Sequence, residues 1–96
     1  MIEVHQAEWC PYSSDVRERL NELDLPFVCR PVPARPQDRH ALAELTGGDP
    51  SIPVVVLEDG TILSGDTSRT LAELDRRFPE PPGAEAHRQA LAAHRG

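Results

Sequence analysis

Cys10, Pro11, Tyr12 and Ser13 form the segment of the chain best suited to chemistry. The residues before Cys10 alternate as in a strand, and Pro11 suits the first position of a helix, so the thiol is expected where a helix begins. Free backbone N–H groups and the positive end of the helix dipole meet at that point, and both favour the thiolate, which is the nucleophilic form. The residues alone leave a second interpretation open, in which Cys10 is a small buried residue that fills the start of the helix.

Cys29 is the second of two cysteines. It could form a disulfide with Cys10 only if the two Cα atoms came within roughly 7 Å, and a helix is expected between them. We therefore expect Cys29 to be a buried, inert thiol on the second strand. Two cysteines are too few for a disulfide-stapled scaffold. We expect a reducing, cytoplasmic location because neither a membrane span nor a signal peptide is expected.

The first third of the chain predicts a strand, a helix and a second strand. Residues 2–6 alternate between the two faces of a strand. Val16, Leu20 and Leu23 recur at helical spacing and predict one apolar stripe on a helix. Residues 27–33 predict the second strand, which we place at or near a sheet edge because its two prolines cannot donate to a ladder.

The rest of the chain predicts a helix, a hairpin and a third helix. A second helix is expected from Pro36 to the glycines that follow Thr46. Residues 54–57 are a continuous apolar run, typical of a strand that is buried on both faces. Asp59-Gly60 predicts a two-residue turn to an antiparallel strand over residues 61–63.

This order of elements predicts an α/β fold with a four-stranded mixed sheet and helices on both faces. The strand–helix–strand unit is expected to be parallel and right-handed, and the hairpin adds antiparallel strands. Residues 1–78 are expected to form one domain. The prolines that follow separate residues 79–96, a weakly helical tail with one large apolar residue, Leu91.

Composition excludes several classes of partner. The 96 residues carry 16 acidic and 10 basic side chains, for a net charge of −6. That balance argues against nucleic acid and against an anionic membrane surface. No apolar stretch approaches the ~20 residues that cross a bilayer, and no signal peptide is expected. The four histidines share no ligand spacing with the cysteines, so we expect no metal site. We also expect a monomeric protein.

Several short segments resemble the glutaredoxins and, more widely, thioredoxin-fold proteins that bind glutathione. In chain order they are Cys10-Pro11-Tyr12-Ser13, Leu45-Thr46-Gly47, Ser51-Ile52-Pro53, Asp59-Gly60 and Ser64-Gly65-Asp66. The resemblance covers Ile2 to about Phe78 and implies a thioredoxin-like fold. The first segment is also similar to the N-terminal domains of glutathione transferases, for whose helical second domain 96 residues leave no room.

The resemblance implies a thiol–disulfide oxidoreductase that acts on protein mixed disulfides. Cys10 would attack the mixed disulfide, keep the small thiol on its own sulfur, and be regenerated by a second small thiol. Ser13 stands where dithiol members have a second cysteine, so only the monothiol route is expected. The cosubstrate would be glutathione or another low-molecular-weight thiol such as mycothiol, with no tightly bound cofactor.

The resemblance also implies residues that bind the small thiol. Pro53 would be a cis-proline that exposes the backbone of Ile52, although a trans proline that starts a strand is the alternative. Gly65-Asp66-Thr67 would hold a carboxylate at a helix N-terminus, or would be a plain helix cap. Arg39 would bind a second carboxylate, or would be a solvated arginine on a helix face.

Two features differ from the family pattern, and a third feature, the pair of aromatic residues beside Cys10, has more than one interpretation. Ala7 replaces a lysine that glutaredoxins often have, and Glu8 adds a negative charge, so we expect Cys10 to be less acidic than in strong glutaredoxins. Asp66 stands one position before the acid usual in the family. Trp9 and Tyr12 flank the nucleophile and predict an apolar wall of the substrate groove, and for Trp9 half-buried packing is the alternative.

Two other functions remain open on the same fold. One is a non-catalytic module that binds glutathione or carries an iron–sulfur cluster between two subunits, and Pro11 weighs against the cluster because monothiol members that carry one usually have glycine there. The other is an interaction domain that uses the fold as a scaffold.

Overall fold

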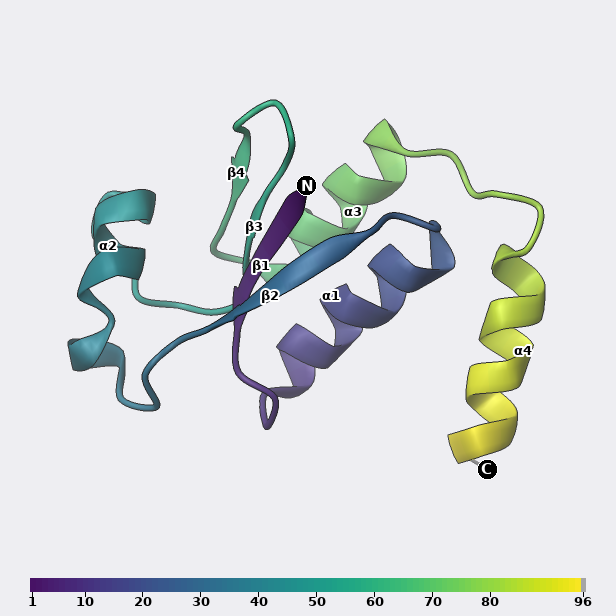
Figure 1. Ribbon diagram of the computed structural model, residues 1–96, viewed down its shortest axis with the longest axis horizontal. Coiled ribbons are helices and arrows are strands. Elements are labelled where there is room, and N and C mark those ends of the chain that lie inside the picture. Colours follow the sequence, from purple (N-terminus) through teal and green to yellow (C-terminus); the bar gives the residue numbers. More distant parts are fainter. Residues whose placement is uncertain (96) are drawn as a thin grey trace.

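The computed structural model describes residues 1–95 and contains one four-stranded sheet (Figure 1). In chain order the strands are β1 (Ile2–Gln6), β2 (Phe27–Pro31), β3 (Val54–Val56) and β4 (Ile62–Leu63). Their order across the sheet is β2-β1-β3-β4. β1 and β2 are parallel and the other two pairs are antiparallel, which confirms the predicted mixed sheet of a thioredoxin-like α/β fold.

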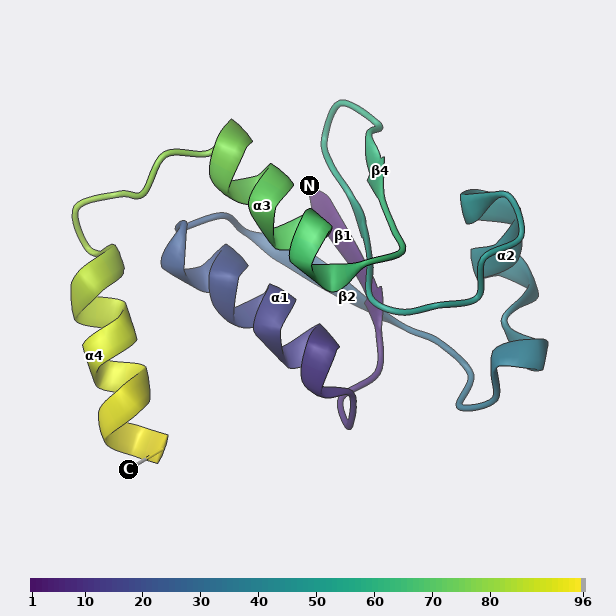
Figure 2. The same ribbon diagram turned by 180° about the vertical axis from the view of Figure 1, so that it is seen from behind.

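Four α-helices accompany the sheet: α1 (Pro11–Glu22), α2 (His40–Thr46), α3 (Thr67–Arg77) and α4 (Ala84–Arg95). Figure 2 shows α1 and α3 side by side over one face of the sheet, while α2 lies apart from them on the connection from β2 to β3. α4 lies at the opposite end of the molecule from α2, beside α1. Within residues 1–95 no helix combines the length and apolar character that crossing a bilayer demands.

The hydrophobic core lies between the sheet and the layer of α1 and α3. The largest fully buried aliphatic side chains include Val4 of β1, Leu20 of α1 and Leu74 of α3, each 0% exposed. Complete burial of a leucine stabilises the fold by roughly 1.5–3 kcal/mol. These positions lie on the stripes that the sequence predicts, because residues three or four apart share a helix face and alternate residues share a strand face.

The connection from β2 to α2 differs from its prediction. β2 ends at Pro31 rather than at residue 33, although the Val32 N–H still donates to the Gln6 carbonyl at 3.2 Å. A short 3₁₀ turn over Pro36–Asp38 replaces the expected start of the helix. Arg39 then takes a non-helical conformation, with ψ 57°, and α2 begins only at His40.

The hairpin between β3 and β4 has a three-residue loop rather than the two-residue turn we predicted. The Leu57 N–H donates to the Thr61 carbonyl at 2.8 Å, and the Gly60 N–H donates back to the Leu57 carbonyl at 2.9 Å. A two-residue type I′ turn needs positive φ at both central residues, whereas only Gly60, with φ 89°, has it here. The Asp59 carboxylate accepts from the Thr61 N–H at 2.9 Å, which fixes the loop.

Ion pairs attach α4 to the rest of the molecule. Ala84 is 1% exposed, so the start of the helix is buried. Arg88 Nη1 lies 2.7 Å from Glu80 and 3.5 Å from Glu22 of α1. Arg19 of α1 contacts the same two carboxylates, at 2.9 and 2.7 Å. The predicted helix in the tail is confirmed, and charged side chains contribute to its docking in addition to the half-buried Leu91.

Candidate functional site

Cys10 is the N-cap residue of α1, at the point where the chain leaves β1. Its backbone is extended, with φ −82° and ψ 121°, and its carbonyl accepts the Ser14 N–H at 3.1 Å. Pro11 occupies the first helical position, where its missing N–H costs nothing. The Cys10 residue is 5% exposed and forms no disulfide. The strand-to-helix junction thus places the thiol where the sequence predicts it.

The surroundings of Cys10 favour the thiolate. Burial by itself raises the pKa of the thiol. The Ser13 hydroxyl, the backbone N–H groups of Ser13 and Tyr12, and the positive charge of Arg39 together outweigh it and leave the pKa below its ordinary value. Dipoles and charges at a helix start stabilise an anion, which is the effect expected of this position. Cys10 is therefore buried, as the second interpretation predicts, and its surroundings favour the thiolate, as the first interpretation predicts.

Ser13 is the unusual residue of the first turn of α1. It is 0% exposed, and its Oγ is the only buried side-chain oxygen or nitrogen in residues 1–94 that lacks a hydrogen-bond partner. A buried donor without a partner costs roughly 1–3 kcal/mol. Because a thiolate is a much better acceptor than a thiol, ionisation of Cys10 supplies the acceptor that this hydroxyl lacks.

Glu8 affects Cys10 less than its position suggests. Its carboxylate accepts from Gln6 Nε2 at 2.9 Å and lies 3.7 Å from Arg17 Nη2. It is not among the main groups that shift the pKa of Cys10, but it helps to raise the pKa of Cys29. The glutamate is thus held on the side of the loop that faces β2.

The peptide bond between Ile52 and Pro53 is cis, as the resemblance implies. Pro53 is almost completely buried, and Ile52 is half-buried. In residues 1–95 the N–H and C=O of Ile52 make no backbone hydrogen bond. Both groups are therefore available to a ligand in the way a strand edge is available to a further strand.

A groove of about 390 Å³ borders this segment. Its walls come from α1, from the residue before the cis-proline and from the start of α3, through Tyr12, Asp15, Ile52, Gly65, Asp66, Thr67, Ser68 and Leu71. The groove thus brings together five residues predicted from the sequence, Tyr12, Ile52, Gly65, Asp66 and Thr67. Cys10, Pro11, Ser13, Arg39 and Pro53 are not among its lining residues.

Three lining residues were not predicted: Asp15, Ser68 and Leu71. Asp15 follows Tyr12 by three positions, so both lie on one face of α1. That spacing was the available signal for a place beside Tyr12. Ser68 and Leu71 could not be placed without knowing how α3 is turned against α1.

Asp66 is the N-cap residue of α3. Its carboxylate accepts the Ser68 N–H at 2.9 Å, and its carbonyl accepts the Arg69 and Thr70 N–H groups, both at 3.1 Å. The helix-cap interpretation is thus confirmed. Gly65, with φ 85°, lets the chain turn into the helix in a conformation that other residues rarely adopt. A role in binding the small thiol stays a prediction for these residues.

Arg39 is buried, so the interpretation of this residue as a solvated arginine on a helix face is wrong. It is 6% exposed, and three of its N–H groups donate to carbonyl oxygens of Pro33 at 2.8 Å, Ala34 at 2.9 Å and Pro50 at 3.0 Å. The guanidinium therefore joins the segment after β2 to the segment before the cis-proline. A contact with a ligand carboxylate stays a prediction.

Two further predictions near the site are wrong. Cys29 is exposed rather than buried, because β2 is the edge strand and no neighbouring element covers this position. Burial of part of the side chain still raises the pKa of its thiol. Trp9 is 67% exposed and does not line the groove, so it is neither half-buried packing nor a wall, whereas Tyr12 is a wall as predicted.

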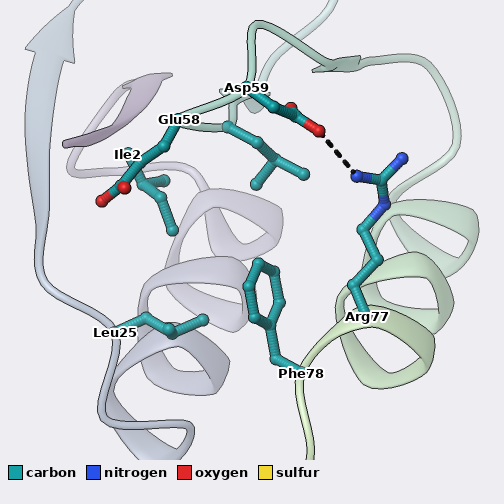
Figure 3. Close-up of a pocket in the computed structure, with 7 residues that line it drawn as sticks. Ile2, Leu25, Glu58, Asp59, Arg77 and Phe78 are labelled. Atoms are coloured by element: carbon teal, nitrogen blue, oxygen red, sulfur yellow. Dashed lines mark hydrogen bonds and ion pairs between the residues drawn. The ribbon is translucent and has the colours of Figure 1, made fainter.

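A second cavity of about 430 Å³ lies at the opposite end of β1 (Figure 3). Ile2, Leu25, Leu57 and Phe78 form its apolar surface, and an ion pair of 3.2 Å between Arg77 and Asp59 borders it. Ile2 begins β1 whereas Cys10 follows its end, so this cavity is separate from the thiol site. It contains no nucleophile. The described residues contain no group of three or more histidine, cysteine or acidic side chains arranged to hold a metal.

A sequence model of the glutaredoxin family matches residues 2–62 of the chain. No curated protein matches the sequence significantly.

Many solved structures are similar in fold. A glutathione S-transferase from Rhodospirillum rubrum F11 is 22% identical with a TM-score of 0.72, over 84% of this chain and 36% of that one. A glutathione S-transferase from Methylobacillus flagellatus KT, with glutathione bound, is 26% identical with a TM-score of 0.62, over 82% and 38%. Glutaredoxin 2 from Salmonella typhimurium, in complex with glutathione, is 14% identical with a TM-score of 0.70, over 84% and 35%. The chain thus spans less than two-fifths of the length of each.

Proposed function

Because the chain belongs to the glutaredoxin family, we propose that it is a monothiol thiol–disulfide oxidoreductase whose nucleophile is Cys10. The observation that carries this proposal is the position of Cys10 as the N-cap residue of α1, where the Ser13 hydroxyl and the N–H groups of Ser13 and Tyr12 lower the pKa of its thiol. A thiolate attacks disulfides and a thiol does not, so this position has the property that the reaction needs. Its substrates are mixed disulfides between proteins and glutathione or a similar low-molecular-weight thiol.

The reaction consists of two exchanges. The Cys10 thiolate attacks the sulfur of the small thiol in a mixed disulfide. A new disulfide forms between Cys10 and the small thiol, the old disulfide breaks, and the protein sulfur leaves as a thiolate that takes a proton. A second small thiol, as its thiolate, then attacks the small-thiol sulfur bound to Cys10. This step yields the symmetrical small disulfide and regenerates the Cys10 thiolate.

Ser13 makes the second exchange depend on a small thiol. A thiol at this position could attack the disulfide on Cys10 and release the small thiol, but a hydroxyl cannot. Instead, the Ser13 hydroxyl and the N–H groups of Ser13 and Tyr12 stabilise the Cys10 thiolate before attack and after release. The same groups make Cys10 a good leaving group, which speeds its own regeneration.

The groove beside Ile52 is the place we assign to the small thiol. A ligand that lies along the cis Ile52–Pro53 segment can pair with the free N–H and C=O of Ile52. Tyr12 borders the groove two residues after Cys10, so a thiol that is bound through its sulfur to Cys10 can extend its remaining atoms into this space. The groove volume of about 390 Å³ suits a small molecule.

Turnover of a mixed disulfide by single-cysteine variants tests this function. A peptide disulfide-linked to glutathione serves as substrate, with excess reduced thiol, and peptide release is followed by chromatography. We expect Cys29→Ser to retain the wild-type rate and Cys10→Ser to lose it, with circular dichroism showing that both variants are folded. Full activity in Cys10→Ser, or loss of activity in Cys29→Ser alone, would contradict the proposal.

A further inference from the structure

We propose that two copies of this chain associate by antiparallel pairing of their β2 strands, and that a disulfide between Cys29 and the partner's Cys29 holds the pair together. The free edge of β2 is thus a surface that the chain offers to a second copy of itself under oxidising conditions. The inference goes beyond the proposed function, because neither Cys10 nor the groove takes part in it.

β2 is the long unpaired edge of the sheet. It is an outer strand of five residues, and within residues 1–95 only β1 pairs with it. Four of its five residues are exposed, whereas β4, at the other edge, has only two residues. An exposed edge presents unpaired N–H and C=O groups to another chain, and proteins usually protect one by covering it, shortening it or placing charges on it. In the described chain β2 is as long as β1, is covered by no further strand, and carries one charge, Arg30.

The backbone groups that face outward belong to alternate residues of β2. The Val32 N–H donates to the carbonyl of Gln6, the last residue of β1, at 3.2 Å, so Val32 faces β1. Because the N–H and C=O groups of successive residues in a strand point to opposite sides, the even-numbered residues of β2 face β1 and the odd-numbered residues face outward. Phe27 and Cys29 therefore present both groups at the free edge, and Pro31, which has no N–H, presents its carbonyl alone.

Pairing about Cys29, the central residue of β2, is self-complementary. Full overlap of two antiparallel copies places Cys29 opposite the partner's Cys29, Phe27 opposite the partner's Pro31, and Val28 opposite the partner's Arg30. The two cysteines then exchange both of their outward hydrogen bonds, and each Phe27 N–H meets the carbonyl of the partner's Pro31. The missing N–H of Pro31 falls at the end of the paired segment. No like charges face each other, because each Arg30 lies opposite a valine.

This register brings the two Cys29 thiols within reach of a disulfide. Residues opposite each other in a hydrogen-bonded antiparallel pair have Cα atoms roughly 5.5 Å apart, and a disulfide joins Cα atoms about 4.4–6.8 Å apart. Cys29 is a free, exposed thiol. One strand edge is small beside the roughly 1,000 Å² or more that specific interfaces bury. The strand pairing therefore needs the disulfide, and the reduced chain is expected to be monomeric.

The oxidant in this step is a low-molecular-weight disulfide. The thiolate of one Cys29 attacks it, forms a mixed disulfide and releases one small thiolate. The thiolate of the partner's Cys29 then attacks the Cys29 sulfur of that mixed disulfide, which forms the bond between the chains and releases the second small thiolate. Each released thiolate takes up a proton, so two protein thiols are oxidised and one small disulfide is reduced to two thiols. Burial of part of the side chain raises the pKa of the Cys29 thiol, and a thiol of higher pKa leaves more slowly, so the bond persists once it has formed.

The test uses the full chain with Cys10→Ser, which leaves Cys29 as the only cysteine, and Cys10→Ala as a second background. The protein is equilibrated in a buffer of reduced glutathione and glutathione disulfide and quenched with acid, and intact-mass spectrometry measures the fraction of linked dimer. Amide exchange followed by NMR then compares the purified dimer with the reduced monomer. We expect the Phe27 and Cys29 N–H groups to exchange at least roughly tenfold more slowly in the dimer. A linked dimer in which these two groups exchange as fast as in the monomer would overturn the strand pairing.

Val28→Cys is the matched control, made in a chain that also carries Cys10→Ser and Cys29→Ser. It moves the only thiol by one residue along the same exposed strand. In the proposed register the two copies of position 28 are diagonal neighbours, roughly 7–8 Å apart, at or beyond the limit for a disulfide. We therefore expect the equilibrium constant for its linked dimer to be at least about tenfold smaller than that for Cys29. Equal or stronger linkage through position 28 would overturn the register centred on Cys29. Because Cys10 is absent throughout, neither result bears on Cys10 as the nucleophile.

Discussion

The Ser13 hydroxyl and the Cys10 thiol lie in the same first turn of α1, where the hydroxyl is completely buried and lowers the pKa of the thiol. No other described residue accepts from this hydroxyl. Ser13 therefore does more than mark the absence of a second thiol. It places a hydroxyl donor beside the nucleophile, and this donor has an acceptor only when the nucleophile is ionised.

We predict that Ser13→Ala raises the pKa of Cys10 toward its ordinary value, because the hydroxyl is the strongest of the groups that lower it. The ultraviolet absorbance of the thiolate, followed as a function of pH in the Cys29→Ser background, measures this pKa. Ser14→Ala is the control, since the Ser14 hydroxyl faces Glu18 at 3.2 Å. An unchanged pKa in Ser13→Ala would show that the hydroxyl does not act on the thiol.

The same substitution separates function from stability. Removing a buried hydroxyl that has no partner relieves a desolvation cost of roughly 1–3 kcal/mol. We therefore expect the free energy of unfolding of reduced Ser13→Ala, measured with urea at acidic pH where the Cys10 thiol is protonated, to equal or exceed that of the wild type. A loss of stability in this variant would indicate that the hydroxyl has a structural partner.

Arg39 is expected to be important for stability. In Arg39→Ala three carbonyl oxygens lose a charged donor, and we predict a loss of about 2–5 kcal/mol in the free energy of unfolding. Arg39→Lys should not restore it, because a single ammonium cannot reach three carbonyls in the planar geometry of a guanidinium. Arg35→Ala, which breaks only an exposed pair with Asp38, should cost less than about 1 kcal/mol. Equal losses at positions 35 and 39 would contradict the structural role of Arg39.

Much of this architecture follows from the sequence, because local signals decide it. The apolar spacing of Val16 and Leu20 and the position of Pro11 define α1, and they put Cys10 at its start. The prediction that Cys29 is buried was wrong because burial depends on what covers an edge strand, which is a tertiary property. The prediction of a solvated Arg39 was wrong for the same kind of reason, since its three acceptors lie on two separate segments.

Glu73 makes the free energy of unfolding depend on pH in the acidic range. Arg76 and Arg77 lower the pKa of Glu73 from 4.5 to about 2. A carboxylate whose pKa is lowered in the folded state stabilises it above the unfolded pKa and loses this effect as the pH falls through the folded one. We predict that the stability difference between wild type and Glu73→Gln is constant above about pH 5 and shrinks as the pH falls toward 2.

Urea unfolding between about pH 6 and pH 3 measures this difference. Glu44→Gln is the control, because Glu44 is an exposed carboxylate on α2. Its difference from the wild type should change little over the same range. A wild-type to Glu73→Gln difference that does not change with pH would contradict the ion pairs of Glu73 with Arg76 and Arg77.

The docking of α4 is predicted to be sensitive to salt. Arg88 joins α4 to Glu80 and Glu22, and partly exposed ion pairs of this kind contribute about 0–1 kcal/mol each and weaken with ionic strength. In Arg88→Ala, or at high salt, we expect faster amide exchange over residues 84–95 and little change in β1 or α1. Gln89→Ala should exchange like the wild type. Unaltered exchange in Arg88→Ala would mean that apolar contacts hold the helix.

The adduct formed on reduced wild-type protein by one equivalent of a glutathione mixed disulfide, mapped by intact-mass and peptide mass spectrometry, tests the central claim most directly. Because Ser13 cannot resolve the adduct, we predict glutathione on Cys10 that persists until a small thiol is added and then leaves to restore the free protein. A disulfide between Cys10 and Cys29, or an adduct confined to Cys29, would contradict a monothiol mechanism through Cys10.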